Sequence, residues 1–285
     1  CAKVEDIIKI VDKDVKAIIP VAYGGQPPNM PEIYNYAKSR DIIVIEDACH
    51  GPGSKFTYKG CIYNLGGHGF TDLSVFSFHP VKNFTTAEGG MITTNNKSFY
   101  EKARRLRNHG ITKRKQDFTG MLPDYGMWSY EMQCLGFNYR MNEIQSALGR
   151  SQLSRLDSII KRRNAIIDIY NDAFKDIKYV RTPRCSDFNN KELISWHLYT
   201  LQINFDSLNL SKNLFMEFML DNNIGTQVLY IPVYLQPFYQ SALSYRKGKC
   251  RIAEKVYYNS ISLPLFEMKP KEVDHVIKTV HKILM

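Results

Sequence analysis

Short β-branched apolar runs and amphipathic segments alternate along the first half of the chain. The runs at residues 16–22, 41–47, 73–78 and 90–93 have the composition of strands, and residues 31–40 have helical spacing. Strand, helix and strand in this order predict a βαβ unit whose central strand is parallel to its neighbours and covered on both faces. The doubled glycine at positions 89 and 90 predicts a sharp reversal before the last of these runs.

The second half of the chain has a different pattern. Helical spacing recurs at residues 97–107, 141–147 and 152–174, and residues 112–134 read as a polar, aromatic loop. The remaining predicted elements are a strand at 196–205, a helix at 213–224, a strand at 226–233 and a helix at 271–284. We therefore predict an α/β fold with a mostly parallel sheet in a large domain, residues 1–150. A bridging helix and a smaller α+β domain are expected over residues 151–285.

The opening of the chain and its composition narrow the class of protein. The first residues have the pattern of a helix end that leads directly into a strand, so we expect the N-terminal part of the large domain to be missing. The 285 residues are 44% apolar and 23% charged, which excludes disorder and collagen. With no signal peptide and no apolar run near the roughly 18 residues that span a membrane, we expect a cytoplasmic protein without membrane partners.

Charge and cysteine usage say less about the partner. The net charge of +10 makes anionic ligands attractive, but the basic residues form short clusters without a nucleic-acid-binding motif, so no nucleic-acid partner is expected. The six cysteines show neither a CxxC pair nor metal-ligand spacing. We expect them to be reduced, and we expect no metal site.

Two charged residues lie where neighbouring strands of the predicted sheet end. Asp47 ends one strand, and Lys82 lies just beyond the strand at 73–78. Because open α/β sheets bind ligands at the carboxyl ends of their strands, both side chains are predicted to face one crevice. A partly desolvated lysine can form a Schiff base, and an aspartate can keep a pyridine nitrogen protonated, so the pair outlines a pyridoxal phosphate site. On spacing alone, the pair also fits a surface lysine and an aspartate that caps a helix or turn.

Longer motifs surround this pair in a fixed order. They are IIVIEDACHGPGSKF, SVFSFHPVKNFTTAEGGMITTNN, LRNHGI, LGFNYRMNEIQSALGRSQLSRLD and SISLPLF. Together they resemble the DegT/DnrJ/StrS family of sugar aminotransferases, and the resemblance covers essentially the whole chain. It implies a fold-type I aminotransferase that depends on pyridoxal phosphate.

The resemblance also implies cofactor-binding residues. Lys82 would bind pyridoxal phosphate covalently and move the proton between the substrate carbon and the cofactor, and Asp47 would hold the pyridine nitrogen. His50 would lie near the phenolic oxygen of the cofactor. Ser77 would bind the cofactor phosphate, although its place on a strand also fits a plain buried serine. Asn138 would reach the cofactor phosphate of a neighbouring subunit, which implies a homodimer with shared sites.

Three further residues are implied on the substrate side. Arg140 could serve either that cofactor phosphate or a substrate diphosphate. His79 is adjacent to the site, without an assigned role. Tyr230 follows Leu229, which stands where similar proteins usually have a histidine.

The motifs also indicate a reaction. Lys82 argues against the branch of the family in which a histidine replaces the lysine, and TTAEGG is similar to enzymes that aminate C4 of a keto sugar. The resemblance implies amino transfer from glutamate to C4 of a UDP-linked 4-keto-6-deoxy-N-acetylhexosamine, for nonulosonic (pseudaminic) acid and surface glycans. The alternatives are another nucleotide-sugar C4 aminotransferase, such as one for a UDP-4-keto-pentose, or a non-catalytic regulator that binds pyridoxal phosphate or a sugar nucleotide.

Overall fold

The computed structural model describes residues 1–120, 126–186 and 190–285, which separate into two compact units. Unit 1 consists of Cys1–Tyr23 and Pro27–Leu156. Unit 2 consists of Gly24–Gln26 and Asp157–Met285.

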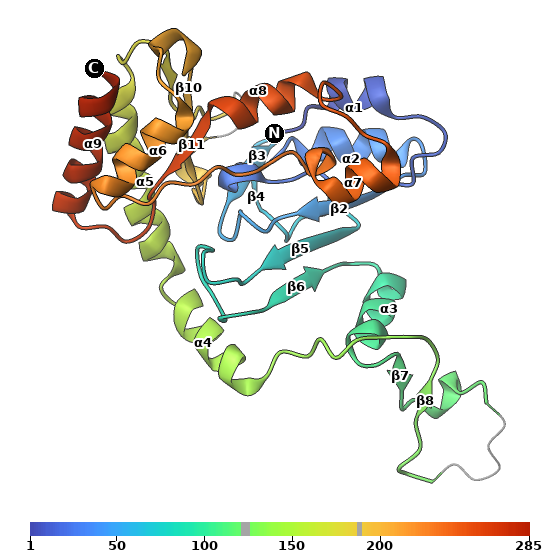
Figure 1. Ribbon diagram of the computed structural model, residues 1–285. Coiled ribbons are helices and arrows are strands. Elements are labelled where there is room, and N and C mark those ends of the chain that lie inside the picture. Colours follow the sequence, from blue (N-terminus) through green and yellow to red (C-terminus); the bar gives the residue numbers. More distant parts are fainter. Residues whose placement is uncertain (121–125, 187–189) are drawn as a thin grey trace. The chain divides into compact units, whose positions relative to one another are not determined.

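A four-stranded sheet runs through unit 1 (Figure 1). Its strand order is β1 (Ala17–Ile18), β2 (Ile43–Asp47), β5 (Leu73–Ser77) and β6 (Gly90–Thr93). β2 is parallel to both β1 and β5, whereas β6 is antiparallel to β5. The predicted α/β fold with a mainly parallel sheet is confirmed, whereas the chain reverses over the loop of residues 78–89 and Gly90 already begins β6.

The helices of unit 1 begin where the sequence supplies start signals. They are α1 (Val4–Ile10), α2 (Met30–Lys38), α3 (Lys97–Arg107) and α4 (Glu143–Leu153). Pro31 lies in the first turn of α2, and Asn96 caps α3 by accepting hydrogen bonds from two backbone N–H groups of the first turn. Asn142 and Gln145 form a capping box at the start of α4.

The central strand β2 is less covered than the sequence predicts. Val44 and Glu46 are fully buried, and the buried residues of α2 include Met30, Ile33 and Ala37. The alternate residues of β2 point to the opposite face of the sheet and are only partly covered by the described residues. The expectation of a strand covered on both faces is therefore wrong within the described part of the chain.

Unit 1 also contains two hairpin-like pairs that the pattern does not predict. β3 (Lys55–Tyr58) and β4 (Cys61–Asn64) are antiparallel, joined by Lys59 and Gly60, which both have positive φ, as a tight primed turn requires. β7 (Ile111–Thr112) pairs with β8 (Glu131–Met132) inside the segment expected to be a loop. Residues 121–125 of that segment lie outside the described residues.

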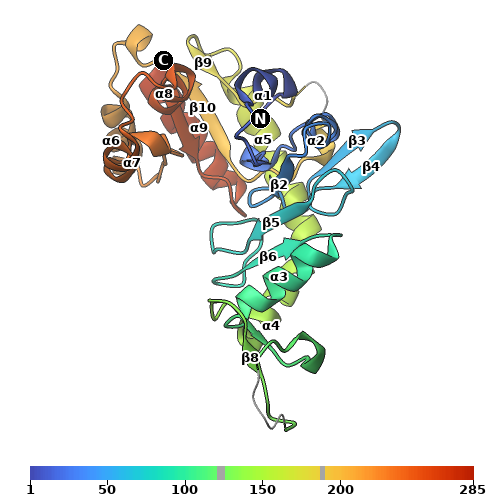
Figure 2. The ribbon, with the colours of Figure 1, turned by 90° about the vertical axis from the view of Figure 1, so that its right-hand side faces the viewer.

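Unit 2 is built on the three-stranded antiparallel sheet β11–β10–β9, with β9 at Val180–Arg181, β10 at Tyr199–Ile203 and β11 at Ser260–Leu263. Its helices are α5 (Leu156–Phe174), α6 (Lys212–Asp221), α7 (Pro237–Leu243), α8 (Arg251–Asn259) and α9 (Pro270–Leu284). Buried side chains of α5, α6 and α9 form one core with those of β10, and Figure 2 shows the ribbon of these elements. Short 3₁₀ turns complete the chain at Tyr23–Gly25, Lys115–Asp117, Lys191–Leu193, Asp206–Leu208 and Val233–Leu235.

The strand predicted at residues 226–233 is not formed. Gln227 exchanges backbone hydrogen bonds of 3.1 and 2.7 Å with Ser262, but the ladder does not continue beyond this isolated bridge. Pro232 has no N–H to donate, and a 3₁₀ turn begins at Val233. The neighbour of β10 is instead β11, which the pattern does not predict.

No helix in the described part of the chain has both the length and the apolar character needed to span a bilayer.

Candidate functional site

Asp47 is fixed at the carboxyl end of β2 by backbone pairing on both sides. Its N–H donates to Pro20 O and its carbonyl accepts from Ala22 N–H, both at 2.9 Å, while Val75 of β5 lies opposite. The carboxylate Oδ1 accepts a hydrogen bond of 3.0 Å from the N–H of Cys49. The Asp47 side chain is therefore held at the strand end and remains partly exposed.

Lys82 lies in the loop that joins β5 to β6. The loop closes on Phe78, whose N–H donates to Gly89 O at 2.9 Å and whose carbonyl accepts from Thr86 N–H at 3.0 Å. Lys82 N–H donates to His79 O at 3.0 Å, which forms a tight turn at the lysine. Partial burial lowers the pKa of Lys82, while the nearby Cys49 and Asp47 raise it. The structure thus brings the amine within electrostatic reach of Asp47.

His50 joins this group from the turn after β2. Its side chain is buried, and its ring lies 5.8 Å from the ring of Tyr23. Burial and the positive charge of Lys82 lower the pKa of His50 to about 4, against the opposing effect of Asp47. The imidazole is therefore neutral near pH 7 and presents an uncharged ring beside the Lys82 amine and the Asp47 carboxylate.

Cys49 is the member of this group that sequence reasoning missed. Its thiol donates to Val75 O at 3.7 Å, and burial, a hydrogen bond with Asp47 and the negative charge of Asp47 raise its pKa to about 12. A thiol that stays protonated is a weak nucleophile, so its contribution here is a hydrogen bond rather than a reaction. Its position two residues after Asp47 was the available signal.

Ser77 and His79 shape the start of the Lys82 loop. Ser77 ends β5, is partly buried, and its Oγ accepts a 3.4 Å hydrogen bond from His79 N–H. The exposed His79 ring accepts from Val81 N–H through Nδ1 at 3.4 Å, and its Nε2 lies 3.9 Å from Glu88 Oε1. The His79 ring therefore contacts the loop itself, and its predicted substrate contact stays a prediction.

Asn138 and Arg140 lie beside the end of α3. Asn138 forms an isolated bridge with Asn108, and the flanking residues Phe137 and Tyr139 donate backbone hydrogen bonds of 2.7 and 2.9 Å to the last residues of that helix. The Arg140 guanidinium donates to Asn108 Oδ1. Both residues are exposed, and the Asn138 backbone and the Arg140 side chain contact the end of α3, so their predicted phosphate contacts stay predictions.

Tyr230 belongs to unit 2, where it is exposed and partial burial of its hydroxyl raises its pKa. Its predicted role in substrate binding stays a prediction.

A buried carboxylate lies on β2 directly before Asp47. Glu46 accepts hydrogen bonds from Gly66 N–H at 2.9 Å and from Ser74 Oγ at 2.7 Å, and His68 Nε2 lies 2.9 Å from its other oxygen. His68 Nδ1 accepts from Phe70 N–H at 3.0 Å, so the ring hydrogen is on Nε2 and is donated to Glu46. Glu46 and Asp47 point to opposite faces of the sheet, so this network ties β2 to β5 and leaves the Asp47 face free.

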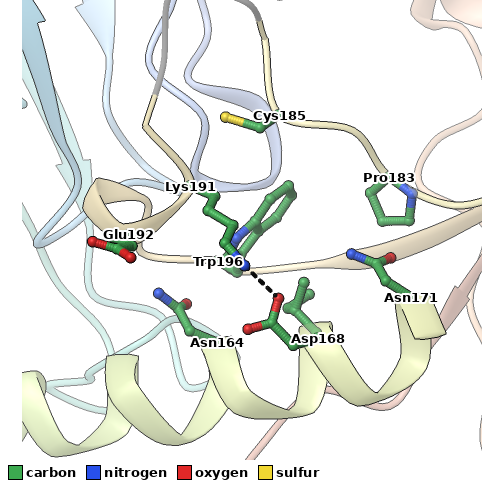
Figure 3. Close-up of a pocket in the computed structure, with 9 residues that line it drawn as sticks. Asn164, Asp168, Asn171, Pro183, Cys185, Lys191, Glu192 and Trp196 are labelled. Atoms are coloured by element: carbon green, nitrogen blue, oxygen red, sulfur yellow. Dashed lines mark hydrogen bonds and ion pairs between the residues drawn. The ribbon is translucent and has the colours of Figure 1, made fainter.

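Unit 2 contains a pocket of about 130 Å³ (Figure 3). Its polar lining is already paired in part, because Lys191 Nζ lies 3.3 Å from Asp168 Oδ1 and Asn171 accepts a 3.0 Å hydrogen bond from Tyr199. Trp196 forms an apolar wall. The pocket lies within unit 2 and shares no residue with the group around Lys82.

Among residues 1–120, 126–186 and 190–285, no three His, Cys, Asp or Glu side chains gather in an arrangement that could hold a metal ion.

The group in unit 1 fits pyridoxal phosphate by the chemistry of its side chains. An amine with a lowered pKa suits attachment to the cofactor aldehyde, and a carboxylate suits the protonated pyridine nitrogen. The neutral His50 ring can lie against the cofactor without adding charge, and the Ser77 hydroxyl can donate to a phosphate. Asp47 and Ser77 end β2 and β5, and His50 and Lys82 lie in the segments that follow these strands.

Comparison with known proteins identifies the family of the chain. The sequence matches the DegT/DnrJ/EryC1/StrS aminotransferase family over residues 1–281. It is 40% identical over 282 residues to the uncharacterized protein MJ1066 of Methanocaldococcus jannaschii, covering 99% of this chain and 70% of that protein. It is 36% identical over 274 residues to the UDP-4-amino-4,6-dideoxy-N-acetyl-beta-L-altrosamine transaminase of Campylobacter jejuni serotype O:23/36, covering 95% and 66%.

Solved structures show the same fold. Helicobacter pylori PseC, an aminotransferase involved in the biosynthesis of pseudoaminic acid, superposes with a TM-score of 0.82 at 30% identity, covering 98% of this chain and 69% of that chain. The PLP-form of the putative sugar aminotransferase Spr1654 from Streptococcus pneumoniae gives a TM-score of 0.81 at 26% identity, covering 99% and 72%. The chain thus spans about two thirds of the length of the curated relatives that it matches.

Proposed function

Because the chain belongs to the DegT/DnrJ/EryC1/StrS aminotransferase family, we propose that it transfers an amino group from glutamate to C4 of a UDP-linked 4-keto-6-deoxy-N-acetylhexosamine. The observation that carries this proposal is the meeting of Lys82, Asp47 and His50 at the ends of β2 and β5. The choice of sugar is supported by the Campylobacter transaminase and by PseC, whose names specify that sugar class and its pathway. The product would serve nonulosonic acid and surface glycan synthesis.

The residues of the site have separate tasks. When bound, pyridoxal phosphate supplies an aldehyde that carries the amino group and a ring that accepts electron density when a C–H bond breaks. Lys82 Nζ would hold the cofactor and, once displaced by substrate, would take the proton from the glutamate α-carbon and return one to C4 of the sugar. Its lowered pKa favours both tasks, because a neutral amine is the form that attacks a carbonyl and accepts a proton.

Asp47 keeps its carboxylate in place for the pyridine nitrogen through the 3.0 Å hydrogen bond from Cys49 N–H. His50 would lie against the cofactor as a neutral ring, near the phenolic oxygen. Ser77 would donate its hydroxyl hydrogen to the cofactor phosphate. Together these side chains would orient the cofactor so that Lys82 reaches the reacting carbon.

We also propose a homodimer in which the segment of residues 126–140 contacts the second copy. Several large apolar side chains of this segment are exposed to solvent: Met127 is 98%, Trp128 79% and Leu135 82% exposed. An apolar patch of this kind on a folded chain marks an interaction surface. Asn138 and Arg140, exposed at the end of the segment, would then reach the phosphates of the cofactor or the substrate in the second copy. Tyr230 and His79 are the proposed substrate contacts.

The test is amino transfer measured by mass spectrometry. The protein is loaded with pyridoxal phosphate, supplied with glutamate, and given either the UDP-linked 4-keto-6-deoxy-N-acetylhexosamine or a UDP-4-keto-pentose. The proposal predicts an amino sugar from the hexosamine, and product from the pentose alone would identify another C4 aminotransferase. Cofactor or nucleotide binding without product from either sugar would favour the non-catalytic regulator. A matched control is Lys13→Ala, which removes an exposed lysine of unit 1 in a turn and should leave turnover unchanged.

A further inference from the structure

Helix α4 approaches the Lys82 loop so closely that only a glycine fits at the contact. A Cβ built on Gly149 would lie 2.6 Å from Thr86 Cγ2, well inside ordinary van der Waals contact. Gly149 is buried and lies in the interior of α4, where glycine lowers helix stability by roughly 0.5–1 kcal/mol relative to alanine. The close approach of the Thr86 side chain therefore explains why a glycine occupies this helix position.

Thr86 has little freedom to move away from the helix. Its side chain is 2% exposed, and its Oγ1 donates a 2.8 Å hydrogen bond to Glu88 O. Rotating the methyl group away from α4 would break this hydrogen bond, because a threonine carries both groups on one stiff carbon. Gly89 also lies close to the Thr86 hydroxyl, since a Cβ built on Gly89 would collide with Thr86 Oγ1.

The main chain of Thr86 is joined directly to the part of the loop that carries the amine. Thr86 N–H donates to Phe78 O at 3.0 Å, and Thr85 Oγ1 donates to the same carbonyl at 2.8 Å. Between these contacts Asn83 and Phe84 are buried, and the Phe84 ring lies 4.9 Å from that of Phe78. A shift at Thr86 would therefore displace Phe78, the residue directly before the turn that contains Lys82.

We propose that Gly149 and Thr86 are positioning residues for Lys82, with the close contact of α4 setting where the loop holds the amine. Neither residue touches the reacting atoms. An added methyl group at Gly149 pushes the loop from α4, loosens the turn at Lys82 and lets water reach the amine. This inference rests on the proposed function for the chemistry of Lys82, but the placement of the amine can be measured without cofactor.

The experiment compares four forms of the chain: wild type, Gly149→Ala, Thr86→Ser, and the double variant Gly149→Ala/Thr86→Ser. Serine lacks Cγ2 but keeps the hydroxyl that bonds to Glu88 O, so the double variant has room for the added methyl. In the first readout, trace acetic anhydride labels each protein without cofactor, and mass spectrometry gives the labelling rate of Lys82 against pH. In the second, the rate of attachment of pyridoxal phosphate to Lys82 is followed by absorbance, and thermal unfolding is recorded alongside.

We expect Gly149→Ala to slow labelling of Lys82 about threefold at pH 8, because rehydration returns the amine pKa toward its ordinary value and leaves less of it neutral. Attachment of pyridoxal phosphate should slow about tenfold. A full 1 Å misplacement can cost about a hundredfold in a positioned reaction, and the shift of the loop is expected to be smaller than that. The double variant should recover both rates to within about twofold of Thr86→Ser.

Two results would overturn the inference: a Gly149→Ala protein that melts earlier but labels Lys82 as the wild type does, or a double variant that recovers neither rate. If Gly149→Ala does not fold, Thr86→Val keeps the methyl, removes the hydrogen bond to Glu88 O, and must slow labelling in the same way. If wild-type Lys82 takes up no pyridoxal phosphate while the labelling rates follow the expected order, the proposed function fails and the positioning contact stands.

Discussion

Unit 2 has one continuous core in which Tyr170, Phe174, Tyr199 and Phe215 are buried together, whereas the core of unit 1 is split into smaller clusters. Yet the residues that fit the cofactor are in unit 1, at strand ends and in a loop. Backbone hydrogen bonds hold them there, such as those that fix Asp47 and close the loop on Phe78. The difference indicates that side-chain packing supports one unit and local hydrogen bonding places the chemistry in the other.

The largest expected effect is that of Lys82→Ala, a unit 1 substitution that should change activity without changing stability. Removing the amine should lower transaminase activity by at least about a thousandfold, because the group that binds the cofactor and moves the proton is lost. The half-buried Lys82 contributes little to packing, so the unfolding temperature should barely change. Product formation by mass spectrometry and thermal unfolding by circular dichroism check the two halves of this prediction. Activity within tenfold of wild type would contradict it.

Phe215→Ala should have the opposite effect. Truncating this fully buried ring of α6 should lower the free energy of unfolding of unit 2 by about 3–5 kcal/mol. Urea unfolding followed by the fluorescence of the buried Trp196 reports on this unit. The matched control is Leu214→Ala, one residue earlier and 56% exposed, which should cost about 0.5 kcal/mol or less. Equal effects of the two substitutions would show that unit 2 does not depend on its core.

His50 should make unit 1 sensitive to acid. Its pKa of about 4 in the folded protein lies below the ordinary 6.5, so as pH falls from 6.5 toward 4 the unfolded chain takes up a proton that the folded chain does not. Stability is therefore complete above pH 6.5 and falls by about 3 kcal/mol by pH 4. Urea unfolding by circular dichroism at pH 7 and pH 4 should show a smaller loss for His50→Gln. The same loss in both proteins would exclude His50 as its source.

The smallest effect is expected at the exposed apolar segment of unit 1. Trp128→Ser should weaken the proposed dimer by about 2 kcal/mol, or roughly 30-fold in dissociation constant, as large aromatic residues do at interfaces. Leu220→Ser, at a 67% exposed position of unit 2, is the control and should leave association unchanged. Sedimentation equilibrium measures both. A monomeric wild-type chain would contradict the proposal.

Much of the unit 1 fold follows from local pattern. The β-branched runs predicted β2, β5 and β6. The rule that ligands bind at the carboxyl ends of strands predicted Asp47 and Lys82 at one edge of the sheet. The hairpin β3–β4 was not predicted because its turn is Lys59–Gly60, which lacks the Asn or Asp typical of such turns. The strand predicted at residues 226–233 does not form because Pro232 has no N–H to donate to a ladder, so pairing ends at the single bridge between Gln227 and Ser262.

The candidate site divides in a similar way. The motifs were sufficient to predict Lys82, Asp47, His50 and Ser77 as site residues. They could not predict burial or hydrogen bonds, because these depend on the tertiary structure. The burial that lowers the pKa of His50 and the Cys49 hydrogen bond to Asp47 are of this kind. So is the network around Glu46, whose buried side chain meets three hydrogen-bond donors that no motif indicates.

The central claim is that Lys82 is the amine that binds pyridoxal phosphate, and borohydride trapping tests it most directly. The protein is incubated with limiting pyridoxal phosphate, reduced, digested and mapped by mass spectrometry. We expect the label predominantly on Lys82, and Lys13→Ala should leave it there. A folded protein whose label is spread over exposed lysines, with none on Lys82, would show that Lys82 does not bind the cofactor.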